Sequence, residues 1–107
     1  MTVNLRRGKW DATTKRIRSI LEKYEQDHPG CTIDLYRQNS VSVRIRIVDP
    51  SFADLSRAER EEPVWRHLDR LDEDTRSDIT ILLLLTPDET ADSFLNQEFE
   101  NPVPSRL

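Results

Sequence analysis

The chain is short of the residues from which most catalytic and metal-binding motifs are built. Its 107 residues include one cysteine, two histidines and two glycines. A single cysteine cannot form an intramolecular disulfide, and no paired CxxC or HExxH spacing occurs. Two isolated glycines cannot build a phosphate-binding loop, and no GxSxG serine motif is present. We therefore expect a protein that is not an enzyme and that has neither cofactor nor metal.

Long apolar runs are also missing. The longest, residues 79–86, reads Ile-Thr-Ile-Leu-Leu-Leu-Leu-Thr and is far shorter than the ~20 residues that a membrane helix needs. The first twenty residues contain no apolar run of the signal-peptide type. Together with the single cysteine, this pattern indicates a reducing, cytoplasmic setting and no membrane association.

The length of the chain predicts one domain. We expect residues 1–10 to be a basic N-terminal arm, residues 11–100 the single domain, and residues 101–107 a flexible C-terminal tail. Charged residues make up 34% of the chain. Its apolar residues are nevertheless concentrated in periodic segments, which excludes wholesale disorder.

The charges are distributed unevenly along the chain. Residues 1–18 hold six basic groups and one acidic group, whereas residues 86–107 hold five acidic groups and one basic group, and the net charge is −4. Proteins that bind duplex nucleic acid usually present a net basic face, so overall acidity argues against that function. We favour a solvated basic arm attracted to the acidic tail, although the arm alone could touch phosphate.

Hydrophobic periodicity predicts the first three elements. Residues 11–26 form a helix, because Ile17, Ile20, Leu21 and Tyr24 follow the spacing i, i+3, i+4, i+7. The Pro-Gly pair at residues 29–30 ends it. Residues 31–36 and 41–48 then alternate with a period of two around a polar turn, which predicts a β-hairpin.

Capping signals predict the remaining helices. Residues 56–59 (Ser-Arg-Ala-Glu) form a capping box, and Pro63 predicts a short turn and a kink before a helix that reaches about residue 71. Residues 86–89 (Thr-Pro-Asp-Glu) predict the start of the last helix. Between these helices, residues 79–86 have the continuous apolar character of a strand covered on both faces, so we expect them at the centre of the sheet.

The elements assemble into an α/β (α+β) fold, in the order α-β-β-α-β-α. We expect two layers and a three-stranded mixed sheet, with a parallel crossover from the second strand through the second helix to the third strand. Two layers would leave Leu82 and Leu84 pointing away from the helices. The final helix or a second protomer would then have to cover them.

With this order of elements, the segment from Phe52 to Trp65 resembles the BolA-like family, small αββαβ proteins related to the type II K-homology fold. Phe52 occupies the family's phenylalanine position, Arg60 its first arginine and Trp65 its aromatic residue. The resemblance covers about residues 17–90. It presupposes that residues 79–86 lie inside the sheet.

The resemblance implies a non-enzymatic adaptor or stress-response regulator. Members that keep the family's histidines take part in iron–sulfur complexes with monothiol glutaredoxins, so the resemblance also implies a monothiol glutaredoxin as a partner. Here Asp54 replaces the family's glycine, Glu61 its histidine and Glu62 its second arginine, and the histidine before the last strand falls at Asp78. The loss of both histidines argues against cluster ligation by this chain.

Two kinds of contact surface remain as candidates. Contacts with nucleic acid or a partner would use basic residues of the arm and the hairpin: Arg6, Arg7, Lys9, Arg37, Arg44 and Arg46. Pairing of at least one hairpin arginine with Asp34 across the sheet is the alternative. An apolar surface formed by Trp65, Leu82 and Leu84 would suit a protein partner or a homodimer.

The possible metal ligands have a simpler interpretation. His28 and Cys31 lie close enough in sequence to share an ion, but a helix-ending residue followed by a small buried thiol explains them equally well. We assign no role to His67. We therefore expect a protein that acts through protein contacts, with a nucleic-acid-binding regulator as the alternative.

Overall fold

Four strands form one mixed sheet in the order β1-β2-β3-β4 in the computed structural model, which describes residues 3–102. β1 (Val3–Leu5) is parallel to β2 (Thr32–Asn39), which forms the predicted antiparallel hairpin with β3 (Ser42–Val48). β3 is parallel to β4 (Ile79–Leu85). The mixed α/β fold is confirmed, with four strands where three were predicted.

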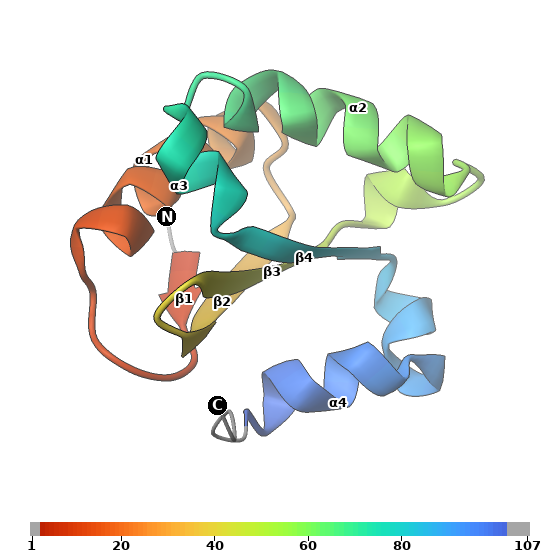
Figure 1. Cartoon of the computed structure of the whole chain (residues 1–107). Helices are drawn as coiled ribbons and strands as arrows, with labels where there is room; N and C mark the ends of the chain where they lie inside the picture. The colour runs from red at the N-terminus through yellow and green to blue at the C-terminus, as the bar shows by residue number, and fades with distance from the viewer. Residues whose placement is uncertain (1–2, 103–107) are drawn as a thin grey trace.

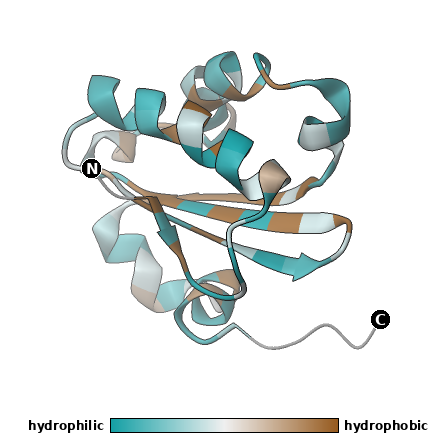
Figure 2. Cartoon of the chain, turned by 90° about the vertical axis from the view of Figure 1, so that its left-hand side faces the viewer, coloured by the Kyte–Doolittle hydropathy of each residue, from teal (hydrophilic) through white to brown (hydrophobic). Residues whose placement is uncertain are grey.

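The helices lie on both faces of the sheet (Figure 1). α1 (Ala12–Asp27), α2 (Arg57–Leu68) and the short α3 (Glu73–Ser77) cover one face, whereas α4 (Phe94–Glu100) lies on the other. The second view separates the same layers and shows the apolar segments of the strands between them (Figure 2). A partial third layer therefore adds to the two layers that were predicted.

Local sequence sets most helix boundaries. Asp11 caps α1 by accepting a hydrogen bond from the Thr14 amide at 2.8 Å, and Ser56 opens α2 with the predicted capping box. α2 continues as one helix through Pro63, where a turn and a kink were predicted. Thr86 is an N-cap residue as predicted, and its amide donates to Oε1 of Glu89 at 2.9 Å. However, residues Pro87–Asp92 form a 3₁₀ helix and α4 begins only after Ser93.

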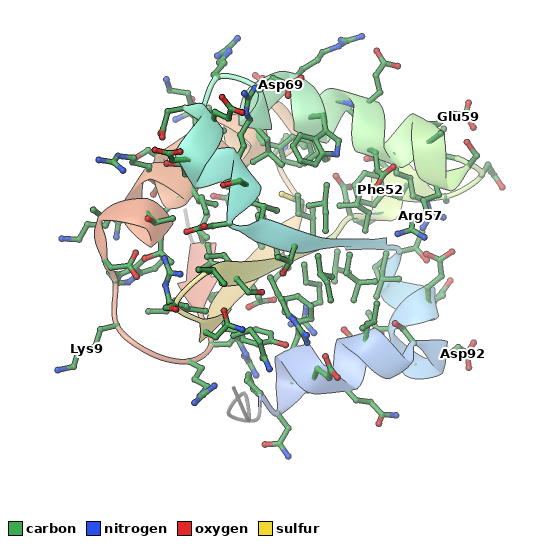
Figure 3. The ribbon with its side chains drawn as sticks, viewed as in Figure 1. Lys9, Phe52, Arg57, Glu59, Asp69 and Asp92 are labelled. Carbon is green, nitrogen blue, oxygen red and sulfur yellow. The ribbon has the colours of Figure 1, made fainter. Side chains whose placement is uncertain are left out.

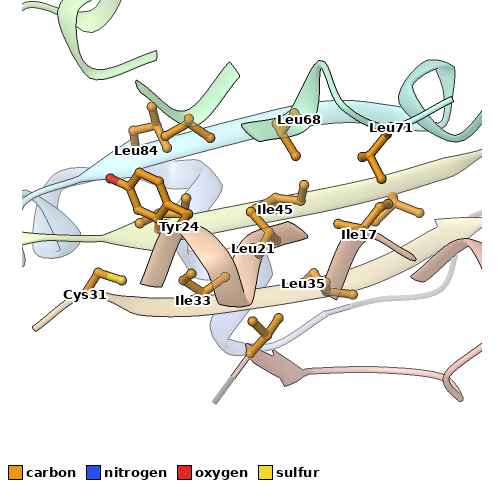
Figure 4. Packing of buried hydrophobic residues seen from close by; sticks show 14 of the residues in the cluster. Ile17, Leu21, Tyr24, Cys31, Ile33, Leu35, Ile45, Leu68, Leu71 and Leu84 are labelled. Carbon is orange, nitrogen blue, oxygen red and sulfur yellow. The ribbon is translucent and has the colours of Figure 1, made fainter. Parts of the chain in front are cut away.

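The main core lies between the sheet and the helices α1 and α2 (Figure 4). The predicted stripe of α1 is confirmed, because Ile17, Leu21 and Tyr24 are fully buried. The odd-numbered residues of the hairpin face these helices and fill the layer beneath them: Ile33, Leu35, Val43, Ile45 and Ile47. Periodicity of 3.6 and of two residues thus identified both sides of the core.

The apolar segment at residues 79–86 occupies an unexpected place. β4 is an edge strand, not the centre of the sheet, and among residues 3–102 it pairs with β3 alone. Leu82 and Leu84 face the main core instead of pointing away from the helices. A continuous apolar sequence indicates that both faces of a strand are covered, but it does not indicate whether another strand pairs with each side. Here α2 and α4 flank the two faces of β4, and its outer edge stays free among the residues described.

The N-terminal segment contains a strand of the sheet, where a basic arm was predicted. Val3–Leu5 form β1, and Val3 is buried in the main core. Three residues are too few to show a period, so no pattern could have predicted this strand. In the predicted tail, residues 103–107 lie outside the described part of the chain. No helix within residues 3–102 has the length and apolar character needed to cross a membrane.

Candidate binding surface

A buried arginine lies at the centre of the sheet face that α4 covers. Arg46 on β3 places Nη2 2.5 Å from Oδ2 of Asp34, its cross-strand neighbour on β2. Its Nη1 donates to Oδ1 of Asn96 at 2.6 Å and to Oε1 of Glu100 at 2.7 Å, both on α4. Burial opposes the charge of Arg46, but the hydrogen bonds from its guanidinium to Asp34 and Glu100 outweigh burial and raise its pKa.

A second arginine and two aromatic rings extend this contact. Arg44 donates to the hydroxyl of Tyr36 at 3.0 Å and forms an ion pair with Glu98 of α4. Phe99 is buried, with its ring edge-on to Tyr36 at a centroid distance of 5.1 Å. Among the described side chains of α4, charged hydrogen bonds and the buried Phe99 therefore both hold the helix on the sheet.

The remaining basic candidates are dispersed. Arg6 donates through Nε to the carbonyl of Phe99 at 3.0 Å, so it also binds α4. Arg37 donates to Oδ2 of Asp11 at 2.7 Å, at the start of α1. Arg7 is half-buried, and Lys9 is exposed on the loop before α1 (Figure 3). The structure thus brings Arg6, Arg44 and Arg46 together, but each is engaged with an acceptor of its own chain.

A groove runs along the free side of β4. One part, of about 390 Å³, is lined by Leu55, Arg57, Arg60, Glu61, residues 82–85, Glu89 and Leu95. An adjoining part, of about 260 Å³, is lined by Arg57, Glu61, Trp65, residues 79–83 and Leu95. Because the two parts share residues, we treat them as one surface and call it the edge groove. Leu55 and Leu95, two of the large apolar side chains that are clearly exposed, both line it.

Charged side chains also line the edge groove, and one pair of them is bonded within the chain. Arg60 donates to both carboxylate oxygens of Glu89, at 2.6 and 3.0 Å, and to the carbonyl of Leu84 at 3.1 Å. The hydrogen bond from Arg60 and the amide of Thr86 lower the pKa of Glu89 to about 2. Arg57 and Glu61 also line the groove, but neither forms an ion pair within residues 3–102. Arg57 reaches from α2 toward the carboxyl end of β4 (Figure 3).

The predicted apolar residues all lie at this groove. Trp65 and Leu82 are half-buried at its wall, whereas Leu84 lines it but is buried in the core. Leu95 was predicted only as part of the apolar side of the last helix, and no sequence pattern indicated that Leu83, Arg57 and Glu61 belong to this surface. Only the edge of the sheet brings these residues together, and no local pattern reveals which strand lies at an edge.

The possible metal ligands pack around Tyr24. The ring of His28 stacks on Tyr24 at 4.1 Å, and His67 meets the same ring edge-on at 5.6 Å. Cys31 is buried, and burial, followed by the charge of Asp49, raises its pKa to about 11. Within residues 3–102 no three His, Cys, Asp or Glu side chains are placed to hold a metal ion.

Nothing matches this chain among protein-family models, curated proteins or solved structures.

Proposed function

We propose that this chain is a non-enzymatic protein that acts through contacts with other proteins made along the edge groove. The observation that carries the proposal is the place of β4: its seven-residue segment, the most apolar in the chain, forms an open sheet edge. An open edge offers unpaired amides and carbonyls to an added strand. The exposed Leu55 and Leu95 beside it make the surface apolar, which is typical of protein interaction sites.

A role as a BolA-like adaptor or stress-response regulator belongs to this proposal. Its support is the order of elements and the registry of the motif. Asp54, at the family's glycine position, has a φ of 66°, in the region that favours glycine. Arg60 and Phe52, two other motif positions, contact each other, with the guanidinium 5.8 Å from the ring centre. The condition that residues 79–86 lie inside the sheet is not met, so the kinship has less support than the protein-contact function.

The nucleic-acid alternative has no comparable support. Arg6, Arg44 and Arg46 are bound to α4, and Arg37 to Asp11. A phosphate would have to displace carboxylates that are already in place. Titration of the chain into fluorescent single- and double-stranded DNA and RNA at low salt should show no binding, and salt-sensitive binding would restore this alternative.

Affinity capture with matched variants tests the protein-contact function. The wild-type chain, Leu95→Glu and Val41→Glu would be immobilised and exposed to native lysate, and captured proteins would be quantified by mass spectrometry. Leu95 is 39% exposed at the groove and Val41 is 64% exposed on the hairpin, so both variants should fold. We expect Val41→Glu to retain the captured proteins and Leu95→Glu to lose them. Identical capture by the two variants would contradict the proposal.

A purified monothiol glutaredoxin tests the family-based partner separately. Calorimetric titration with the chain should show binding that Leu95→Glu weakens and Val41→Glu does not. Absence of binding would remove the glutaredoxin from the proposal and leave the groove as a site for other proteins.

A further inference from the structure

Backbone amides and carbonyls on the free side of β4 are oriented to pair with a further strand. The carbonyl of Leu85 accepts a hydrogen bond from Asp49 at 2.9 Å, toward β3. The carbonyl of Leu84 points the other way and binds Arg60. Backbone polar groups alternate along a strand, so the amide and carbonyl of Leu82 also face outward. No strand of residues 3–102 lies on that side to pair with them.

β4 also lacks the features by which proteins usually protect a sheet edge. Exposed edges are commonly short, charged or interrupted by proline. The opposite edge of this sheet, β1, has only three residues, but β4 has seven and contains neither charge nor proline. Apart from the Arg60 side chain that binds the Leu84 carbonyl, no charged group of the strand itself shields the β4 edge, so this edge is suited to pairing with another chain.

The charges along α2 indicate which chain could pair with the β4 edge. Arg57 and Glu61 stand one helical turn apart at the groove, and neither has an ion-pair partner in the described part of the chain. A purely acidic or purely basic segment would be repelled by one of them. A surface that carries the same two residues in reverse order satisfies both, and a two-fold axis generates that surface from a second copy.

We infer that a second copy of this chain occupies the edge groove, with its β4 antiparallel to β4 and the two sheets joined across a two-fold axis. Arg57 of each copy then faces Glu61 of the other, and Leu83 and Leu95 meet their symmetry mates. The inference rests on the proposed function, because it names the protein that binds at the groove.

Charge reversal provides the test. Sedimentation velocity and light scattering on the 12.6 kDa chain should show a dimer that dissociates on dilution. Arg57→Glu and Glu61→Arg each place like charges across the axis and should weaken the dimer at least tenfold. An equimolar mixture of the two variants should restore it, and so should the double variant Arg57→Glu/Glu61→Arg. Restoration on mixing distinguishes an intermolecular pair from a role in folding.

An ion pair formed within α2 serves as the control. Glu62 and Arg66 are also spaced four residues apart on α2, and they pair with each other on its exposed side. Reversal of either charge should leave the dimer unchanged.

Hydrogen exchange provides a second measurement. The amide of Leu82 should exchange more slowly as the protein concentration rises, since only strand addition gives it a partner.

Different results would overturn the dimer and the protein-contact function. A wild-type chain that is monomeric at every concentration overturns the second-copy inference. If Leu95→Glu still abolishes capture of another protein, the groove keeps its proposed function. A dimer that tolerates both single charge reversals also overturns the inference, because the contact then lies elsewhere.

Discussion

Asp34 and Arg46 form an ion pair that is buried on the sheet face opposite the main core. Their side chains are 2% and 6% exposed, and they lie directly opposite each other on β2 and β3. The same guanidinium binds Asn96 and Glu100, so this pair also positions α4. A buried charge is tolerated only when its hydrogen bonds are satisfied, and here α4 completes them.

Removal of one member of this pair should destabilise the protein strongly. Asp34→Ala leaves the Arg46 charge buried and short of an acceptor, which typically costs about 3–5 kcal/mol. Arg66→Ala, which breaks the exposed pair with Glu62, should cost no more than about 0.5 kcal/mol. Urea unfolding followed by circular dichroism would measure both. Similar losses for the two variants would show that the buried pair has no special role.

Phe99 should be the anchor that keeps α4 on the sheet. Its buried ring contacts Tyr36 and lies 5.5 Å below the Arg46 guanidinium. Phe99→Ala removes this anchor, so we expect α4 to lose amide protection in hydrogen exchange while β2 and β3 keep theirs. Gln97→Ala, at an exposed position of α4, is the control and should leave the exchange unchanged. Uniform loss of protection in the sheet would mean that α4 and the sheet unfold as one unit.

Asp11 should make the free energy of unfolding depend on pH in the acid range. Burial opposes its ionisation, but hydrogen bonds from Arg37 and the Thr14 amide prevail and lower its pKa from 3.8 to about 2. Between these values the unfolded chain binds a proton before the folded chain does. The stabilisation by the charged carboxylate is therefore complete above about pH 5 and is lost as the pH falls toward 2.

Asp11→Asn isolates this contribution, because asparagine caps a helix about as well as aspartate. Urea unfolding from pH 6 to pH 2 should show a shallower loss of stability for Asp11→Asn than for the wild type. Parallel pH profiles would show that the Asp11 charge does not contribute.

The thiol of Cys31 should be nearly inert in the folded chain. It is 8% exposed, and burial raises its pKa from 9.0 to about 11. At pH 8 the thiolate population should therefore be about a hundredfold lower than in the unfolded chain. Reaction with a disulfide reagent should be slow in buffer and fast in concentrated urea. Equal rates in the two conditions would contradict the buried position of this cysteine.

Much of the fold could be predicted because its signals are local. The stripe of α1 and the alternation in β2 and β3 arise within a few consecutive residues, and the structure confirms the core positions of both. The cross-strand pairing of a hairpin arginine with Asp34 is likewise confirmed, since a hairpin brings its two strands together by chain connectivity. β1 escaped prediction because three residues define no period.

The candidate site depends on contacts that no local pattern records. The sequence predicts Arg44 and Arg46 as contact residues of the hairpin, but their partners Glu98 and Glu100 lie more than fifty residues later in the chain. Likewise, the leucines of β4 showed a strand with both faces covered, whereas its place at the edge follows from which strands pair. The sequence alone therefore determined the first helix, the hairpin and the apolar face that each presents to the core, since side-chain periodicity is set residue by residue. Tertiary structure alone decided which arginines are neutralised and which strand edge stays open, because both depend on segments that meet only when the chain is folded.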